Sequence, residues 1–452
     1  MIKQAIILDA GKGTKLWPYA QIRSKGMVPI CNRPVLRHLV DALKNLGVED
    51  ITIVGGAHAA GARNHFRNDE GVRVIEDRNP KGPVFSLCLA KDYIAGDFLA
   101  LFGDTLVTES DLRALVEAQS LPAVLASPLR GRSNDCITCN VNGDRATGFV
   151  GHPRGNHSGH FSAGFAFARE HIALLEANPG RFLVTQVGMM PPLEGFIEMS
   201  LNDYLKDGGQ IAAVVAKDHT VDIDKPWQLY EAEEACKKRL CGALTENVLA
   251  GGASIHPSAA IDGFVQLGEG SSIGRGVIIN GRVIVGKNSQ IRNGAILHGD
   301  CVIGDDTTIE NYCYVDDSTV GSRCYIGHGA ELGGIIWDKV YLYHYMEING
   351  IVGENVDIGA ATVCGSLRFD DGVTRQRVKG RLEAEHPAQD ACFIGDYCRT
   401  GVNAILMPGV KTGVYSVISA GVVLREDLED NTLIYVDQTH VKKAWGPEMY
   451  GW

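Results

Sequence analysis

The stretch IHPSAAIDGFVQLGEGSSIGRGVIINGRVIV, residues 255–285, decides the fold of the second half of this chain. A bulky aliphatic residue stands at every sixth position, and the spacing continues to residue 315. The series is Ile255, Ile261, Leu267, Ile273, Ile279, Val285, Ile291, Leu297, Ile303, Ile309 and Val315. Helices repeat about every 3.6 residues and strands every 2, so this period indicates neither an ordinary helix nor an ordinary strand. Six residues form one flat side of a triangular coil, and we expect the aliphatic side chains to point inward while glycines turn the corners.

The six-residue spacing is lost near Val320 and returns further along the chain. It is visible again at Ile326, Leu332, Ile394, Thr400, Leu406, Thr412, Ile418 and Leu424. Residues 364–391 carry charges and interrupt the pattern, so we expect them to form an external loop. Stacked coils share one continuous core. The pattern therefore predicts a parallel β-helix over residues 253–435, followed by a tail, residues 436–452, that is docked on the surface or frayed.

Residues 1–235 show a different pattern, in which apolar strand-like runs alternate with helical stretches. IKQAIIL is followed by RPVLRHLVDALKNLG, and ITIVGG and DFLALFGD enclose a further helical stretch. This alternation predicts βα units around a largely parallel sheet. Because ligands of such sheets bind at the carboxyl ends of the strands, the loops after IIL and LALF are the expected places for chemistry. Residues 236–252 are expected to be a helical linker between the two domains.

The overall charge excludes some classes of partner. The chain has a formal net charge of -11, which argues against general attraction to nucleic acid or to an anionic membrane face. No apolar stretch is long enough to span a bilayer. The 12 cysteines lack the dense spacing of a secreted disulfide scaffold. We therefore expect a cytoplasmic protein with free thiols and with neither a nucleic-acid nor a membrane partner.

The loop at residues 8–16, LDAGKGTKL, follows the first buried strand. Gly11 and Gly13 let backbone amides approach a phosphate closely, and Lys15 at the end of the loop can neutralise departing pyrophosphate. The loop is not a Walker A motif, because Gly-Lys-Ser/Thr at the proper spacing is missing. A glycine-rich turn is a weak signal by itself, so the interpretation depends on the other motifs.

Four segments together resemble the sugar-1-phosphate nucleotidylyltransferase family, in its order and at its approximate spacing. They are the glycine loop at 8–16, SKGMVPI at 24–30, FGD at 102–104 and VDIDKP at 221–226. The β-helix resembles the acetyltransferase half of bifunctional N-acetylglucosamine-1-phosphate uridylyltransferases of the archaeal type, through IGAATVCGSLRFDDG and ACFIGDYCRTGVNAILMPGV. The resemblance implies an α/β, Rossmann-like nucleotidyltransferase domain followed by a left-handed parallel β-helix.

For the first domain, the resemblance implies an enzyme that joins an NTP to a sugar 1-phosphate, or a similar phosphorylated small molecule, and releases pyrophosphate. Asp104 and Asp222 match the carboxylates that hold Mg²⁺, which prefers oxygen ligands. Lys15 matches a position at the triphosphate and Lys25 one near the α-phosphate, where both would position and neutralise charge. A phosphate oxygen of the sugar 1-phosphate is the attacking group, so no covalent nucleophile is required.

The resemblance also assigns residues that contact the two substrates. The nucleotide-binding residues are Leu8, Ala10, Gly11, Gly13, Thr14, Asp77 and Gly82. The residues that bind the sugar phosphate are Gly103, Gly164 and Glu198.

For the second domain, the resemblance implies an acetyl-CoA-dependent acyltransferase. His344 lies within about a residue of the family's general base, and histidine suits this role because its pKa lies near neutrality. Coenzyme A would lie along the coils between adjacent subunits, near Ala404, Ser419 and Ala420. That placement implies a homotrimer through the β-helix, or a dimer of trimers.

The sequence departs from the family pattern at several site positions. The departures are Asp9, Asp77, Gly82-Pro83-Val84, Gly151, Glu347, Ser366 and Gly372. A buried carboxylate at Asp9 would repel a triphosphate unless it were paired or protonated. Two alternatives follow from the departures. One is a binding or regulatory homologue without catalysis, whose β-helix is a trimerisation scaffold, and the other is a protein in which only the acyltransferase half is active.

Overall fold

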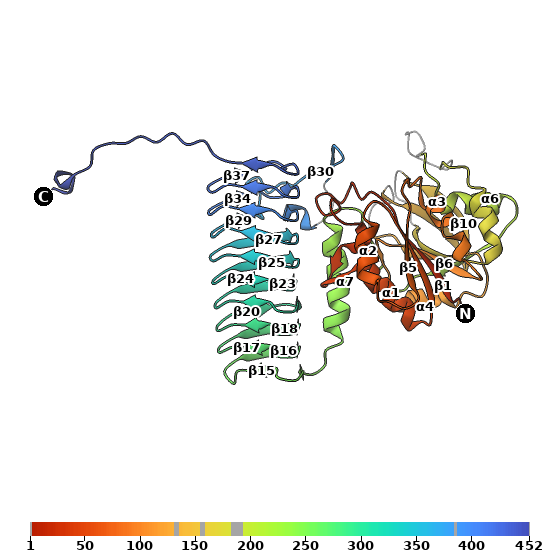
Figure 1. The fold of residues 1–452 in the computed structure, drawn as a ribbon, viewed down its shortest axis with the longest axis horizontal. Coiled ribbons are helices and arrows are strands. Elements are labelled where there is room, and N and C mark those ends of the chain that lie inside the picture. The colour runs from red at the N-terminus through yellow and green to blue at the C-terminus, as the bar shows by residue number, and fades with distance from the viewer. Residues whose placement is uncertain (1, 131–134, 154–158, 182–192, 384–386, 452) are drawn as a thin grey trace.

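The computed structural model describes residues 2–130, 135–153, 159–181, 193–383 and 387–451. Figure 1 shows an α/β region and a tall stack of short strands with a helix between them. The N-terminus belongs to the α/β region. The C-terminal tail is largely exposed and extends away from the stack on the side opposite the α/β region.

A nine-stranded sheet forms the centre of the α/β region. Its strands are β1 (Gln4–Asp9), β4 (Asp50–Gly55), β5 (Val72–Glu76), β6 (Phe98–Phe102), β8 (Ala123–Pro128), β9 (Ile137–Asn142), β10 (Arg145–Gly151), β11 (His160–Phe167) and β12 (Ile211–Val215). Their order in the sheet is β5-β4-β1-β6-β11-β8-β12-β10-β9. Two short pairs are separate, β2 (Pro29–Ile30) with β3 (Arg33–Pro34) and β7 (Thr105–Leu106) with β13 (Val221–Asp222).

The sheet is mixed, which corrects the expectation of a largely parallel sheet. β5, β4, β1 and β6 are parallel to one another. β11 runs antiparallel to β6 and β8, and β10 runs antiparallel to β9 and β12. Parallel strands need a long crossover connection. The turn at Asn142-Gly143-Asp144 between β9 and β10 is too short for a crossover and allows only a hairpin.

Helices cover both faces of the sheet. They are α1 (Val35–Asn45), α2 (Ala59–Phe66), α3 (Pro83–Cys88), α4 (Glu109–Val116), α5 (Ile172–Glu176), α6 (Ile197–Lys206) and α7 (Gln228–Gly242), with short 3-10 turns η1 (Lys25–Met27), η2 (Lys91–Tyr93), η4 (Arg169–His171), η5 (Pro387–Asp390) and η6 (Pro447–Tyr450). Alternate residues of β1 serve the two cores: Ile7 packs with α1, α2 and α4, and Ile6 packs with α3, α5 and α6. Within the described ranges, no helix is both long and apolar enough to cross a membrane.

The second half is a stack of parallel coils arranged in two long sheets. Its strands are β14 (Val248–Leu249), β15 (Ser254–Ile255), β16 (Ala260–Leu267), β17 (Ser272–Ile273), β18 (Ile278–Val285), β19 (Gln290–Ile291), β20 (Ile296–His298), β21 (Cys301–Ile303), β22 (Thr308–Ile309), β23 (Tyr314–Val320), β24 (Tyr325–Ile326), β25 (Glu331–Ile336), β26 (Tyr341–Leu342), β27 (Glu347–Val352), β28 (Asp357–Ile358), β29 (Val363–Cys364), β32 (Cys392–Ile394), β33 (Arg399–Thr400), β34 (Ile405–Leu406), β35 (Lys411–Thr412), β36 (Val417–Ile418), β37 (Val423–Leu424) and β38 (Leu433–Ile434). The six-residue aliphatics point inward as expected, and most form one buried core.

The loss of the six-residue spacing near Val320 has a simple cause, which is that the coils become shorter. Ile291 pairs with Ile309, 18 residues later, but Ile309 pairs with Ile326 after 17 residues. Ile326 then pairs with Leu342 after 16 residues. The aliphatic side chains stay in register between coils, although they lose their even spacing along the chain.

The helix between the two halves begins and ends earlier than the linker expected at 236–252. α7 spans Gln228–Gly242 and starts just after Pro226, a residue that favours a helix start. Its apolar side packs into a cluster with side chains of the stack, including Trp337 and Phe393. The helix is therefore part of an interface between the halves, where it is buried on one side.

Candidate functional site

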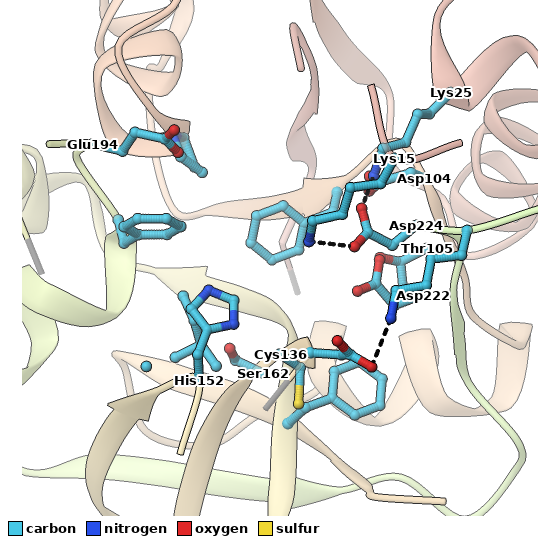
Figure 2. Close-up of a pocket in the computed structure, with 18 of the residues that line it drawn as sticks. Lys15, Lys25, Asp104, Thr105, Cys136, His152, Ser162, Glu194, Asp222 and Asp224 are labelled. Carbon is cyan, nitrogen blue, oxygen red and sulfur yellow. Dashed lines mark hydrogen bonds and ion pairs between the residues drawn. The ribbon is translucent and has the colours of Figure 1, made fainter. Parts of the chain in front are cut away.

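A cavity of about 950 Å³ lies beside the carboxyl end of β6, where the sequence indicated chemistry. In Figure 2 the lysines and aspartates gather on one side of the cavity, and His152 and Glu194 lie on the other. The charged and polar lining residues are Lys15, Lys25, Asp104, Thr105, Asp135, His152, Ser162, Glu194, Glu198, Asp222, Asp224, Lys225, Lys379, Arg381 and Glu383. A cavity of this size is typical of a small-molecule site.

Lys15 and Lys25 form an ion-pair network with two aspartates. Lys25 Nζ lies 2.6 Å from Asp104 Oδ2 and 3.1 Å from Asp224 Oδ1. Lys15 Nζ lies 2.6 Å from Asp224 Oδ2. Burial opposes ionisation of Asp224, but the two ammonium groups outweigh it and hold the pKa of Asp224 below its usual range. The network fixes both lysine heads at the cavity.

A short strand pair brings Asp104 and Asp222 together. β7 and β13 are antiparallel, with Asp222 opposite Thr105, and the Ile223 amide donates to the Asp104 carbonyl at 3.0 Å. Burial, followed by the charge of Asp104, raises the pKa of Asp222 to about 7. Two neighbouring carboxylates are the kind of oxygen ligands that suit a divalent cation. The described residues hold no cluster of three His, Cys, Asp or Glu side chains, so Mg²⁺ here would draw its other ligands from water and substrate phosphate.

Asp9 is buried and lies outside the described cavity lining. Its Oδ1 accepts a hydrogen bond from the Gly26 amide at 3.0 Å. A Cβ at Gly26 would lie 2.9 Å from Asp9 Oδ1, and one at Gly103 would lie 2.9 Å from Asp9 Cβ. Burial raises the pKa of Asp9 to about 7, although the hydrogen bond from the Gly26 amide opposes this shift. Asp9 therefore packs against the backbone at Gly26 and Gly103 and does not block the cavity.

The glycine loop reaches the cavity through Lys15, near its end. Lys15 lines the cavity, whereas the other predicted loop residues do not belong to the described lining. Those residues are Leu8, Ala10, Gly11, Gly13 and Thr14. Gly13 has φ +62°, and a Cβ there would lie 2.6 Å from Ala20 Cβ and 3.1 Å from Lys25 Cγ. Glycine at this position thus allows the loop to turn tightly against Lys25.

Asp77 and Gly82, both predicted to contact the nucleotide, serve local structure in this conformation. Asp77 is buried and accepts hydrogen bonds from the Asn79 amide at 3.0 Å and from Ser86 Oγ at 2.7 Å. Gly82 has φ +118°, and a Cβ there would lie 2.4 Å from the Gly195 nitrogen. Neither belongs to the described lining of the cavity.

Of the three residues predicted to bind the sugar phosphate, Glu198 lines the cavity. It accepts a hydrogen bond from Ser162 Oγ, and its Oε2 is buried without a hydrogen-bond partner among the described residues. Burial raises the pKa of Glu198 to about 7. Gly103 lies against Asp9, and Gly164 lies in β11 against Leu101, both outside the described lining.

Several lining residues were not predicted from the sequence. Asp224 could have been found, because the alternation Asp222-Ile223-Asp224 places both carboxylates on the side opposite the buried Ile223. Lys225 could not, since its partners come from remote segments. Lys225 Nζ lies 2.9 Å from Asp135 Oδ2 and 2.5 Å from Glu383 Oε2.

His344 is exposed at a corner of the coil stack. Its ring meets Tyr345 edge-on, with centroids 5.3 Å apart. Backbone hydrogen bonds connect this corner from coil to coil: Ala361 to His344 at 3.1 Å, Asn403 to Ala360 at 2.9 Å, and Gly421 to Val402 at 3.0 Å. The predicted coenzyme A residues are neighbours of this column in the chain, with Ala404 buried, Ser419 half-buried and Ala420 exposed. The structure thus places His344 and Ala420 along one edge of the stack.

All 12 cysteines are free, as expected from their spacing. Cys136 lines the cavity and Cys139 is buried in β9. Burial raises the pKa of each of these two thiols to about 12, which keeps them protonated.

Comparisons with known proteins match both halves. The family model of the MobA-like NTP transferase domain matches residues 5–187, and that of the GMPPB C-terminal domain matches residues 261–368. The "Bifunctional protein GlmU" of Methanococcus maripaludis (strain C7) is 31% identical over 95% of this chain and 97% of its own length. The protein of that name from Methanococcus vannielii is 28% identical over 97% and 99%. The "Bifunctional sugar-1-phosphate nucleotidylyltransferase/acetyltransferase" of Sulfurisphaera tokodaii is 23% identical over 94% and 98%.

Proposed function

This chain belongs to the family of the bifunctional GlmU proteins and is a sugar-1-phosphate nucleotidylyltransferase, and from that premise we propose that the lysine–aspartate cavity is its nucleotidylyl-transfer site. The observation that carries this proposal is the meeting of Lys15, Lys25, Asp104, Asp222 and Asp224 in one cavity. Family membership favours an active enzyme over the regulatory homologue that the sequence left open.

In the proposed reaction, a phosphate oxygen of the sugar 1-phosphate attacks the α-phosphorus of the NTP in line. The bond between the α-phosphorus and the bridging oxygen breaks, and pyrophosphate leaves with that oxygen. Lys25 positions the α-phosphate, and Lys15 neutralises charge on the leaving group. Asp104 and Asp222 would hold Mg²⁺, which supplies charge neutralisation at the phosphates when bound. Glu198, with its unpartnered Oε2, would bind a hydroxyl of the sugar.

A second activity is proposed for the coil stack, as an acetyl-CoA-dependent acyltransferase with a left-handed parallel β-helix. The shared edge of His344 and Ala420 supports it. His344 would take a proton from the acceptor amine or hydroxyl as that group attacks the thioester carbonyl, and the coenzyme A thiolate would leave. Ala404, Ser419 and Ala420 would contact coenzyme A between subunits of a homotrimer.

The proposed domain boundaries are residues 1–235 for nucleotidyl transfer, 236–252 for a linker that includes the C-terminal part of α7, 253–435 for acyl transfer and 436–452 for the tail. A cytoplasmic location fits the free thiols and the NTP substrate.

Pyrophosphate release tests the first activity, with the four NTPs and a panel of sugar 1-phosphates. We expect release with at least one pair, dependent on Mg²⁺, and a fall in kcat of about 100-fold or more for Asp104→Asn. Asp203→Asn, on an exposed part of α6, should match the parent. Silence of every pair, with nucleotide binding unchanged by Asp104→Ala, would reject the proposed site.

Release of the coenzyme A thiol from acetyl-CoA tests the second activity, with amino-sugar phosphates as acceptors. His344→Ala should lower this rate and leave pyrophosphate release unchanged. Equal rates of thiol release in the parent and the variant would remove His344 from the mechanism.

A further inference from the structure

A hairpin of the coil stack reaches the nucleotidyl-transfer cavity. It consists of β30 (Gln376–Val378) and β31 (Arg381–Glu383), and it lies within the insertion that interrupts the coils. In Figure 1 the strand labelled β30 projects from the stack toward the α/β region. Lys379 and Gly380 form its two-residue turn, with φ of 47° and 79°. This left-handed pair is the geometry of a tight hairpin turn.

The hairpin has one face toward the cavity and one toward solvent. Val378 pairs with Arg381 across the hairpin, and both line the cavity, as do Glu383 and the turn residue Lys379. Arg377 pairs with Leu382 on the opposite face, where both are exposed and neither is part of the described lining. The two faces follow from the alternation of side chains along a strand.

Contacts with the α/β region hold the hairpin in place. Lys225 is buried and bridges Glu383 at 2.5 Å and Asp135 at 2.9 Å. Val378 is buried in the interface cluster that contains Trp227 and Phe393. The hairpin is thus anchored at the cavity by one buried cation and by apolar packing.

The charge of the cavity indicates what the hairpin contributes. With Glu198 set aside, the lining carboxylates among the described residues are Asp104, Asp135, Glu194, Asp222, Asp224 and Glu383. The lysines of the α/β region are already paired with such carboxylates, as the distances above show. Lys379 makes no ion pair within the described ranges, and Arg381 adds a second cation from the same hairpin. An NTP or a sugar phosphate adds further negative charge, so a site that holds one needs cations beyond the three lysines of the α/β region.

We propose that Lys379 and Arg381, supplied by the hairpin of the coil stack, bind a phosphate group of a substrate in the nucleotidyl-transfer cavity. This inference rests on the proposed function of that cavity. The phosphate belongs either to the NTP or to the sugar 1-phosphate. In both cases the coil stack adds two cationic side chains to a cavity whose α/β lysines are already paired with carboxylates.

Titration calorimetry of the full chain with Mg²⁺ tests this inference without turnover. The probes are inorganic pyrophosphate and glucose 1-phosphate, and the variants are Lys379→Ala, Arg381→Ala and the double variant. We expect a Kd about tenfold higher for each single variant and about 100-fold higher for the double variant with one probe. Weaker binding of pyrophosphate assigns the hairpin to the NTP, and weaker binding of glucose 1-phosphate assigns it to the sugar phosphate.

Arg377→Ala is the matched control, because it removes the same charge from the solvent face of the same hairpin, and it should bind both probes like the parent. Lys379→Arg keeps the positive charge and should bind the probes like the parent. In steady state, the KM of the affected substrate should rise more than kcat falls. Unchanged binding of both probes in the double variant, equal weakening in Arg377→Ala, or no binding of either probe to the parent would overturn the inference. A parent that binds the probes but releases no pyrophosphate with any pair would instead reject the proposed function.

Discussion

Glu198 carries a buried carboxyl whose pKa is raised from 4.5 to about 7. The folded state therefore keeps a proton that the unfolded state releases above pH 4.5, and the stability from this group is complete below 4.5 and lost as the pH rises through about 7. For Glu198→Gln this loss should be absent, so the variant should gain about 2–3 kcal/mol over the parent between pH 4.5 and pH 8. Urea unfolding at both pH values measures the difference. Glu194→Gln, an exposed residue of the same cavity, should follow the parent.

Short motifs in the sequence were enough to predict four of the charged residues that line the cavity. Lys15, Lys25, Asp104 and Asp222 each end or follow a strand or loop whose pattern is local, and the structure brings them together. Asp77 was assigned a nucleotide contact, but its carboxylate accepts a hydrogen bond from Ser86 in α3. No local pattern could show this, because the choice between a ligand and a loop contact depends on the position of α3.

Strand β18 contains two adjacent isoleucines with opposite environments. Ile279 is fully buried in the coil core, whereas Ile278 is 39% exposed. Ile279→Ala should lower the free energy of unfolding by about 2–5 kcal/mol, because it leaves a cavity that the stack cannot close. Ile278→Ala should cost less than about 1 kcal/mol. Denaturant unfolding of the pair gives the comparison, and equal losses would contradict the inward orientation of the six-residue series.

Elements with a strict period could be predicted from the sequence, and elements set by pairing partners could not. The coils from Ile255 to Val315 follow from spacing alone. The sheet was expected to be largely parallel, yet β11 lies antiparallel between β6 and β8. Both arrangements bury the same apolar run, HFSAGFAF, so its composition does not distinguish them.

Across the whole molecule, the segment between Lys15 and Lys25 is attached to the coil stack. The Arg23 guanidinium donates to the two carboxylate oxygens of Asp396 at 3.0 and 2.9 Å, and its side chain is only 10% exposed. Tyr19 Oη donates to the Ile351 carbonyl at 2.7 Å. The positions of Lys15 and Lys25 therefore depend on the second half of the chain.

Arg23→Met should destabilise the protein by about 3–5 kcal/mol, because it leaves the Asp396 carboxylate buried without its cation. It should also lower kcat for pyrophosphate release, although Arg23 does not belong to the described cavity lining. Arg33→Met breaks an exposed pair with Asp41 and should cost less than about 1 kcal/mol. Chemical denaturation and pyrophosphate release of the two variants test this. Parent-like turnover in Arg23→Met would show that the attachment does not position the lysines.

The apolar cluster around α7 also constrains how such a protein can change over time. A chain that ended after Gly242 would leave Trp227 and Leu229 facing water, and a chain that began there would do the same to Trp337 and Phe393. Either fragment would tend to self-associate. A domain that lost its activity would therefore still be retained, since the other domain would need its apolar surface as a packing partner.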